Sequence, residues 1–130
     1  MSGVKRQQTC PCDSGKSYTE CCGVLHRGDA TANTAEALMR SRYSAYAVGD
    51  EGYLLRTWHS TTRPQRVDFD PALRWTGLEI LGTTGGSPFH TAGTVEFNAS
   101  YRQNGRAEVM HENSGFARED GRWVYVEAAV

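Results

Sequence analysis

The hydrophobic and polar positions of the chain change their spacing about halfway along it. In the first half, apolar residues recur every three or four positions: Leu38, Met39, Tyr43, Tyr46 and Ala47. This spacing predicts a helix with one buried face. Asn33 or Thr34 can cap its beginning, and Gly49 is suited to end it.

Two shorter helices are expected after the first. One begins at Asp50 and ends near His59, because the following segment 60–64 is polar and finishes in a proline. Asp70-Pro71 is typical of a cap followed by a first helical position, so a third, very short helix is predicted there.

From Trp75 onward the pattern alternates with a period of two, which is typical of strands with one buried face. The alternation is clearest over residues 95–102, and turn signals follow at Asn104-Gly105 and Asp120-Gly121. Further strands are expected at 78–81, 106–118 and 123–126. Helices followed by an antiparallel meander of about four strands indicate an α+β fold.

The composition fits one globular domain without an overall electrostatic target. The 130 residues are enough for one main core and a short appendage. Lys and Arg number 14 against 15 Asp and Glu, so the net charge of -1 gives no general attraction to nucleic acid or anionic membranes. No stretch approaches the ~18 apolar residues of a membrane span, and residues 1–8 are polar, so we expect a cytoplasmic protein without membrane insertion.

Four cysteines fall within thirteen positions, as Cys10-Pro11-Cys12 and Cys21-Cys22. Tetrahedral zinc takes four thiolates at ~2.3 Å, and one short loop can bring two cysteine pairs together. Alternate residues of an extended segment point to the same side, so Cys10 and Cys12 can present both sulfurs to one ion. The sequence therefore predicts a Zn²⁺ site formed by Cys10, Cys12, Cys21 and Cys22.

Other uses of these cysteines are less favoured. A disulfide between Cys21 and Cys22, or between Cys10 and Cys12, would close a strained ring, which makes a redox role the minority interpretation. His26 is an alternative ligand, but with four thiolates present we expect it at the surface or an interface. Metal binding would also supply the folding free energy that so few apolar residues cannot.

The string CPCDSGKSYTECCG at residues 10–23 resembles the SEC-C zinc motif, which occurs at the C-terminus of the SecA translocation motor and in many small bacterial proteins. That family often has histidine as its fourth ligand, where this chain has Cys22, so the ligand count is preserved. In SecA the motif contacts the SecB chaperone and ribosomes. The resemblance therefore implies a protein or ribonucleoprotein partner for this motif.

The remainder resembles the nuclear transport factor 2-like (NTF2-like) cone fold. The segments 38–46, 53–59, 111–116 and 121–125 are similar to the YchJ-like family, which places a SEC-C motif before such a domain. The resemblance implies a cone of two to three helices and a curved antiparallel sheet of about four strands. We expect a SEC-C motif at 1–27, a linker at 28–34 and the cone at 35–130, with a homodimer through the sheet as a further expectation.

The concave side of such a cone is the candidate pocket, with these residues to watch: Tyr43, Trp58, His59, His111 and Glu112. Which residues of the return strand face it depends on the turn at Asn104-Gly105. A two-residue turn pairs Phe97 with Glu112, whereas a three-residue loop pairs Phe97 with His111. We favour the three-residue loop, because it aligns His111 with the apolar face.

Three functions remain, and no catalytic residue is assigned. The favoured one is a zinc-stabilised adaptor whose motif binds a protein partner and whose cone can bind a small ligand. The first alternative is a small-molecule enzyme of isomerase, dehydratase or hydrolase type, with His111 and Glu112 as acid and base. The second is nucleic-acid recognition by the motif, which is disfavoured because a tetrathiolate zinc site would cancel the positive charge of residues 1–27.

Overall fold

The computed structural model of the chain describes residues 9–129, so the first eight residues of the expected SEC-C segment, and Val130, lie outside the described residues. The helical elements come first: η1 (Tyr18–Glu20), α1 (Cys22–His26), α2 (Ala35–Val48) and α3 (Glu51–Arg56). The strands follow: β1 (Leu73–Gly85), β2 (Ala92–Gln103), β3 (Arg106–Glu119) and β4 (Arg122–Ala128). The predicted α+β order is confirmed.

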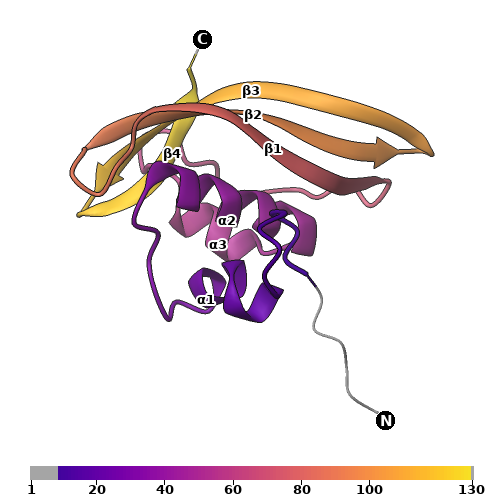
Figure 1. Cartoon of the computed structure of the whole chain (residues 1–130), viewed down its shortest axis with the longest axis horizontal. Coiled ribbons are helices and arrows are strands. Elements are labelled where there is room, and N and C mark those ends of the chain that lie inside the picture. Colours follow the sequence, from indigo (N-terminus) through magenta and orange to yellow (C-terminus); the bar gives the residue numbers. More distant parts are fainter. Residues whose placement is uncertain (1–8, 130) are drawn as a thin grey trace.

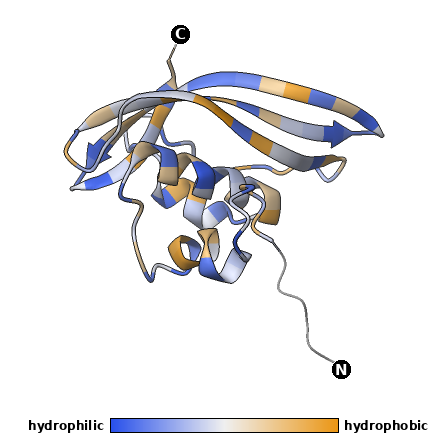
Figure 2. Cartoon of the chain, in the orientation of Figure 1, coloured by the Kyte–Doolittle hydropathy of each residue, from blue (hydrophilic) through white to orange (hydrophobic). Residues whose placement is uncertain are grey.

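The strands form one antiparallel sheet in the order β1-β2-β3-β4. The sheet is curved, and the helices lie on its concave side with α2 nearest to it (Figure 1). Hydrophobic and hydrophilic residues follow one another along the strands (Figure 2). Because neighbouring residues of a strand face opposite sides, this pattern gives the sheet one buried face, which packs on the helices. No helix among residues 9–129 has the length and apolarity needed to cross a membrane.

The predicted ends of α2 are formed by the expected residues. The Thr34 side chain accepts a hydrogen bond from the Ala37 amide at 3.0 Å. Gly49 ends the helix with a φ of 77°, in the left-handed region where glycine carries no Cβ penalty. These caps fix where α2 begins and ends beneath the sheet.

Two details of the helix prediction were wrong. α3 ends at Arg56 and not near His59, because the His59 amide donates to the Tyr125 carbonyl and the Tyr125 amide donates to the Thr57 carbonyl. These bonds pull the segment 57–59 alongside β4. Asp70-Pro71 forms a turn and not a helix, since the Leu73 amide bonds back to Asp70 and β1 begins at once.

The expected register of the β2–β3 hairpin was also wrong. Asn104 and Gly105 both have positive φ angles, 53° and 81°, and form a two-residue turn that pairs Gln103 with Arg106. Phe97 therefore pairs with Glu112. As a result Glu112 lies on the concave face of the sheet, and His111 lies on the outer face.

Candidate functional site

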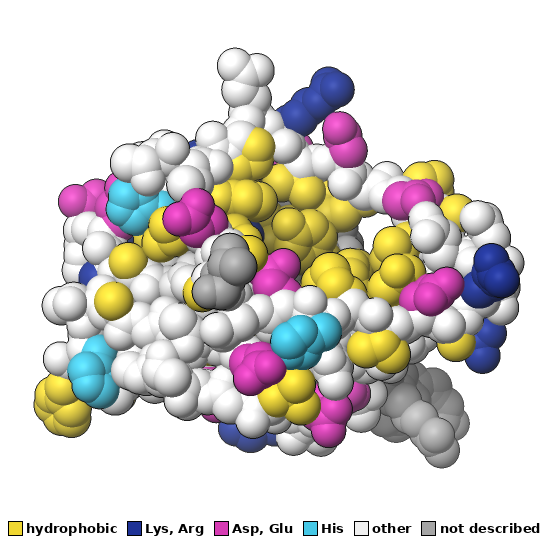
Figure 3. All heavy atoms as spheres, turned by 90° about the horizontal axis from the view of Figure 1, so that it is seen from above, with side chains coloured by type: hydrophobic (Ala, Val, Ile, Leu, Met, Phe, Trp, Pro, Cys, Tyr) yellow, Lys and Arg dark blue, Asp and Glu magenta, His cyan; other side chains and the backbone are white. Residues whose placement is uncertain are grey.

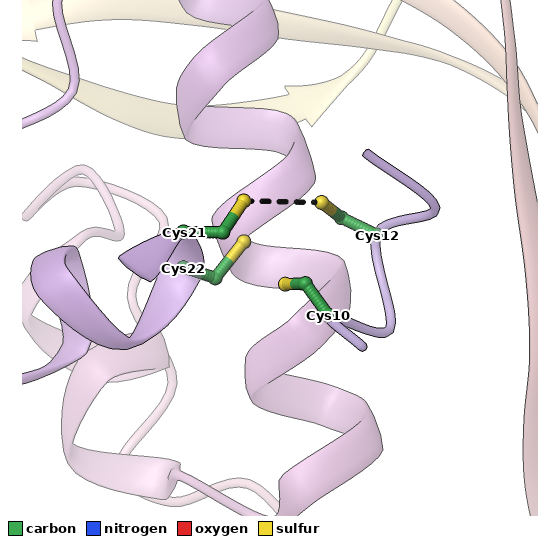
Figure 4. A group of neighbouring side chains, drawn as sticks. All are labelled: Cys10, Cys12, Cys21 and Cys22. Carbon is green, nitrogen blue, oxygen red and sulfur yellow. Dashed lines mark hydrogen bonds between the residues drawn. The ribbon is translucent and has the colours of Figure 1, made fainter. Parts of the chain in front are cut away.

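The four cysteines come together at one point beside α2. Their sulfur atoms all lie within 4.8 Å of one another, and Cys12 Sγ is 3.6 Å from Cys21 Sγ. Figure 4 shows the four side chains converging from two segments, one carrying Cys10 and Cys12 and the other Cys21 and Cys22. A tetrahedral ion with bonds of ~2.3 Å needs sulfurs about 3.8 Å apart, so this set fits a metal ion. None of the four forms a disulfide.

Local backbone bonds fold the two cysteine segments towards each other. The Cys10 amide donates to the Lys16 carbonyl at 2.8 Å, and the Asp13 amide donates to the Cys10 carbonyl at 3.1 Å. The turn between them uses positive φ angles at Asp13 and Gly15, 63° and 87°. Aspartate and glycine tolerate this region better than other residues, which explains their place in the motif.

The thiols differ in their charge state in the absence of an ion. A hydrogen bond from Cys22 lowers the pKa of Cys12 to about 4. The same bond, together with burial, raises the pKa of Cys22, and burial raises the pKa of Cys21. The Cys12 thiolate thus lies beside Cys21 and Cys22 thiols whose pKa values are raised, and a metal ion would stabilise all the thiolates together.

The motif is bonded directly to the cone. Arg40 of α2 donates to the Cys12 carbonyl at 2.8 Å, and Ser44 Oγ lies 3.4 Å from Cys10 Sγ. Asp13 accepts from the Leu78 amide of β1 at 3.1 Å. Cys10, Cys12 and Cys22 are buried in the same cluster as the apolar residues of the cone. The motif and the cone therefore share one core.

His26 is part of this junction, so of the two expected places, a surface or an interface, it occupies an interface. It is buried, with Nδ1 2.5 Å from the Tyr18 hydroxyl and Nε2 2.8 Å from the Ser41 carbonyl. Burial lowers its pKa below the ordinary 6.5. Its ring joins α1 to α2 through these bonds, and among the described residues the group of side chains that could hold a metal ion consists of the four cysteines.

A cavity of about 300 Å³ lies between α2 and the concave face of the sheet. Seen from above the sheet, hydrophobic side chains gather in a hollow of the surface (Figure 3). Three of the expected pocket residues, Tyr43, Trp58 and Glu112, line the cavity. The walls also include Trp75 and Phe97, so aromatic rings form much of the lining.

The two histidines expected in the pocket lie outside it. His111 Nε2 is 2.6 Å from Glu96 Oε2, and both side chains are exposed. His59 is engaged with Thr61 and Glu119. Because neighbouring residues of a strand face opposite sides, His111 and Glu112 do not form the acid–base pair considered for an enzyme.

Arg42 is a cavity residue that the sequence reasoning missed. It is 4% exposed, and its Nη1 donates to the Leu54 carbonyl at 2.8 Å and to Thr57 Oγ1 at 2.7 Å. Its Cζ atom lies 4.8 Å from the centre of the Trp58 ring and 4.9 Å from that of Tyr125. Burial lowers its pKa to about 10, so the guanidinium stays charged at neutral pH. Its spacing of four from Leu38 was the available signal for a buried position.

Glu112 brings a carboxylate to the same cavity. Its Oε2 accepts from Ser114 Oγ at 2.6 Å and from the Tyr125 hydroxyl at 3.4 Å. Burial raises the pKa of Tyr125 to about 12, so its hydroxyl remains a donor at neutral pH. Nearby, the buried Trp58 Nε1 has no acceptor among residues 9–129. The cavity thus combines an apolar wall with a few polar groups, as ligand pockets do.

Comparison with known proteins identifies relatives along nearly the whole chain. The family model described as YchJ, middle NTF2-like domain, matches residues 34–128. A UPF0225 protein of Streptomyces coelicolor is 60% identical over 91% of this chain and 92% of its own length. A UPF0225 protein of Chromobacterium violaceum is 50% identical over 99% of this chain and 98% of its own.

Two solved structures share the fold. The solution structure of a SEC-C motif containing protein from Rhodopseudomonas palustris has a TM-score of 0.80 and 36% identity, covering 93% of this chain and 97% of that one. The crystal structure of a SEC-C motif containing protein from Psychrobacter arcticus has a TM-score of 0.77 and 25% identity, covering 95% and 84%. Both proteins contain the SEC-C motif, which the four-cysteine segment of this chain resembles.

Proposed function

This chain belongs to the YchJ-like, UPF0225 family, and from that premise we propose that it is a zinc-binding SEC-C protein that works as a protein-interaction module. The observation that carries the proposal is the arrangement of four sulfurs within 4.8 Å on a motif that is bonded to the cone and exposes the turn at residues 14–16. Relatives of similar structure are described as SEC-C proteins.

Zinc is the ion that this donor set favours. Four thiolates leave no open position, which is typical of a structural zinc site and not of a catalytic one. Tetrahedral sulfur sites also suit iron, so the metal must be identified by measurement. Elemental analysis of protein purified without chelator should find about one zinc per chain, as expected for a closed site with four protein ligands. A chain purified with iron, or with no metal, would contradict the proposal.

The exposed part of the motif is the proposed contact surface. Ser14, Gly15 and Lys16 form an exposed turn of the motif, next to Asp13, which bonds to β1. The zinc would hold this turn in one shape, so a partner could recognise it without paying to order it. Ribosomes and the SecB chaperone are the probes that the SEC-C resemblance indicates.

Binding to these probes can be tested by co-sedimentation and by pull-down at about 0.15 M salt, where weak surface attraction is screened. Lys16→Glu reverses an exposed charge on the turn while leaving the cysteines in place. Arg106→Glu makes the same reversal at an exposed site of the β2–β3 turn and is the matched control. We expect Lys16→Glu to weaken capture about tenfold with zinc retained, as rim charges do. Equal capture of both variants would contradict the assignment of this surface.

A further inference from the structure

The cone cavity holds two opposite charges that do not meet. Arg42 uses Nη1 for two hydrogen bonds, and neither its Nε nor its Nη2 is bonded to any of residues 9–129. None of the described carboxylates forms an ion pair with it either. A buried charge without a counter-charge is costly, so this guanidinium favours an anion beside it.

Glu112 stands across Tyr125 from that guanidinium. The Arg42 guanidinium lies over the Tyr125 ring, whereas the Glu112 carboxylate receives the Tyr125 hydroxyl. Its second oxygen, Oε1, has no hydrogen-bond partner among the described residues. The cavity therefore offers a donor over the ring of this tyrosine and an acceptor beside its hydroxyl.

Between the two polar ends, the walls are aromatic and apolar. Tyr43, Trp75 and Phe97 line the space together with Met39. Tyr43 and Trp75 meet edge to face with centroids 5.8 Å apart, which leaves ring faces and edges for a further ring to pack against. A volume of about 300 Å³ is at the lower end of pockets that hold small molecules.

We propose that the cone cavity binds a small aromatic acid that carries a hydrogen-bond donor opposite its carboxylate. The carboxylate pairs with the free nitrogens of Arg42, the ring packs among the aromatic walls, and the donor reaches Glu112. A cationic ligand would be repelled by the unpaired guanidinium, and a wholly apolar ligand would leave the guanidinium without a counter-charge. The site is distinct from the metal centre, and its occupant is not needed for zinc binding.

The benzoates provide a matched set of probes. 4-Hydroxybenzoate has both polar ends, benzoate lacks the donor, phenol lacks the carboxylate, and 4-methoxybenzoate replaces the donor with an acceptor. Calorimetry on the zinc-loaded full chain should give saturable binding of 4-hydroxybenzoate, about tenfold tighter than benzoate or 4-methoxybenzoate. Phenol should bind more weakly than benzoate, because it leaves the guanidinium unpaired.

Variants of the two charges separate this site from adventitious binding. Glu112→Gln keeps the side-chain shape and can donate to a methoxy oxygen, so the preference for 4-hydroxybenzoate over 4-methoxybenzoate should fall from about tenfold to near one. Glu96→Gln, on the outer face of the same sheet, is the matched control and should leave the ranking unchanged. Arg42→Met should reduce binding of every benzoate at least about tenfold.

Arg42→Met also removes the bonds to Leu54 and Thr57, so its folding is checked by circular dichroism. The Glu112→Gln ranking does not depend on that variant. Absence of saturable 4-hydroxybenzoate binding at low millimolar concentration, or a ranking that Glu112→Gln leaves intact, would overturn the proposal. Zinc content is measured in every variant, and it should not change. A loss of zinc in these variants would contradict the separation of the ligand site from the metal centre.

Discussion

The cysteine motif and the cone are held together by different forces. In the motif, the 3₁₀ turn η1 contains no buried residue, and the buried side chains of α1 are limited to Cys22 and His26 beside Gly23. In the cone, by contrast, large apolar side chains fill the space under the sheet: Leu38, Val95, Phe97, Phe116 and Trp123. We therefore expect the motif to depend mainly on the proposed metal ion, whereas the cone depends on burial.

α2 belongs to both regions, and its faces differ accordingly. Arg40, Ser41 and Ser44 bond to the motif, while Arg42 and Tyr43 line the cavity. A metal ion bound by the cysteines, as proposed, would therefore also hold the helix that carries the cavity's unpaired charge. We therefore expect that loss of a metal ligand also perturbs the cavity. A substitution that destabilises the cone core should, by contrast, leave the cysteines able to bind metal.

The largest effect is expected from Cys12→Ser, which removes a buried ligand. Structural zinc contributes about 10–16 kcal/mol of apparent binding free energy in small motifs, so losing one ligand should cost several kcal/mol of stability. Zinc content by metal release and the thermal midpoint should fall together. A variant that keeps both would show that the motif folds without the metal, and the contrast with the cone would disappear.

Phe116→Ala should have the next largest effect. It tests whether a weakened cone core impairs metal binding by the motif. Phe116 is buried under the sheet, and such a truncation should lower the free energy of unfolding by about 3–5 kcal/mol. Zinc should still bind at temperatures below the new midpoint. Val109→Ala, at a side chain that is 62% exposed, is the control and should change stability by less than about 0.5 kcal/mol. Loss of zinc from folded Phe116→Ala would mean that the two regions fail together.

Much of this architecture could be predicted from the sequence because the signals are local. The cysteine grouping lies within thirteen positions, and the α2 caps at Thr34 and Gly49 are read from single residues. Such features depend on neighbouring residues along the chain, which is what a sequence displays directly. The α+β order follows from the change in hydrophobic period for the same reason.

The cavity could not be predicted in this way, because its residues come from separate elements. Whether Glu112 or His111 faces it depends on Asn104 and Gly105 both adopting positive φ, and the sequence is compatible with either turn. Arg42 follows the buried spacing of α2, but an arginine is ordinarily placed in solvent. Its burial depends on Trp58 and Tyr125, which reach it from other segments.

A smaller effect is expected at the junction of the two regions. Arg40→Met leaves the Cys12 carbonyl without its 2.8 Å donor and should cost about 1–2 kcal/mol of unfolding free energy. Zinc should be retained but released faster to a chelator, because the segment carrying Cys12 is less firmly held. Arg106→Met, at an exposed position, is the control for loss of an arginine. Release rates that match the control would mean that the motif does not rely on α2.

The smallest effect is a pH dependence at His26, which also lies at the junction. The short contact with the Tyr18 hydroxyl and the one with the Ser41 carbonyl fit a neutral ring that accepts at Nδ1 and donates from Nε2. Protonation would place a hydrogen on Nδ1 and remove the acceptor for Tyr18. Burial is the largest cause of the lowered pKa, and it outweighs the Asp50 carboxylate 3.9 Å away, which favours the charged form.

Because the folded pKa of His26 lies below the unfolded value of 6.5, the unfolded chain takes up the proton first as the pH falls. The stability that the neutral ring contributes is therefore complete above 6.5 and decreases as the pH falls from there towards the folded pKa. Denaturant unfolding of zinc-loaded protein between about pH 7.5 and 5.5 should show this loss, with zinc content checked at each pH. His26→Gln cannot take up that proton, so its stability should be lower at neutral pH but less dependent on pH over this interval. Parallel curves for the two proteins would exclude His26 as the source and would leave the thiols as the groups through which acid acts on the motif.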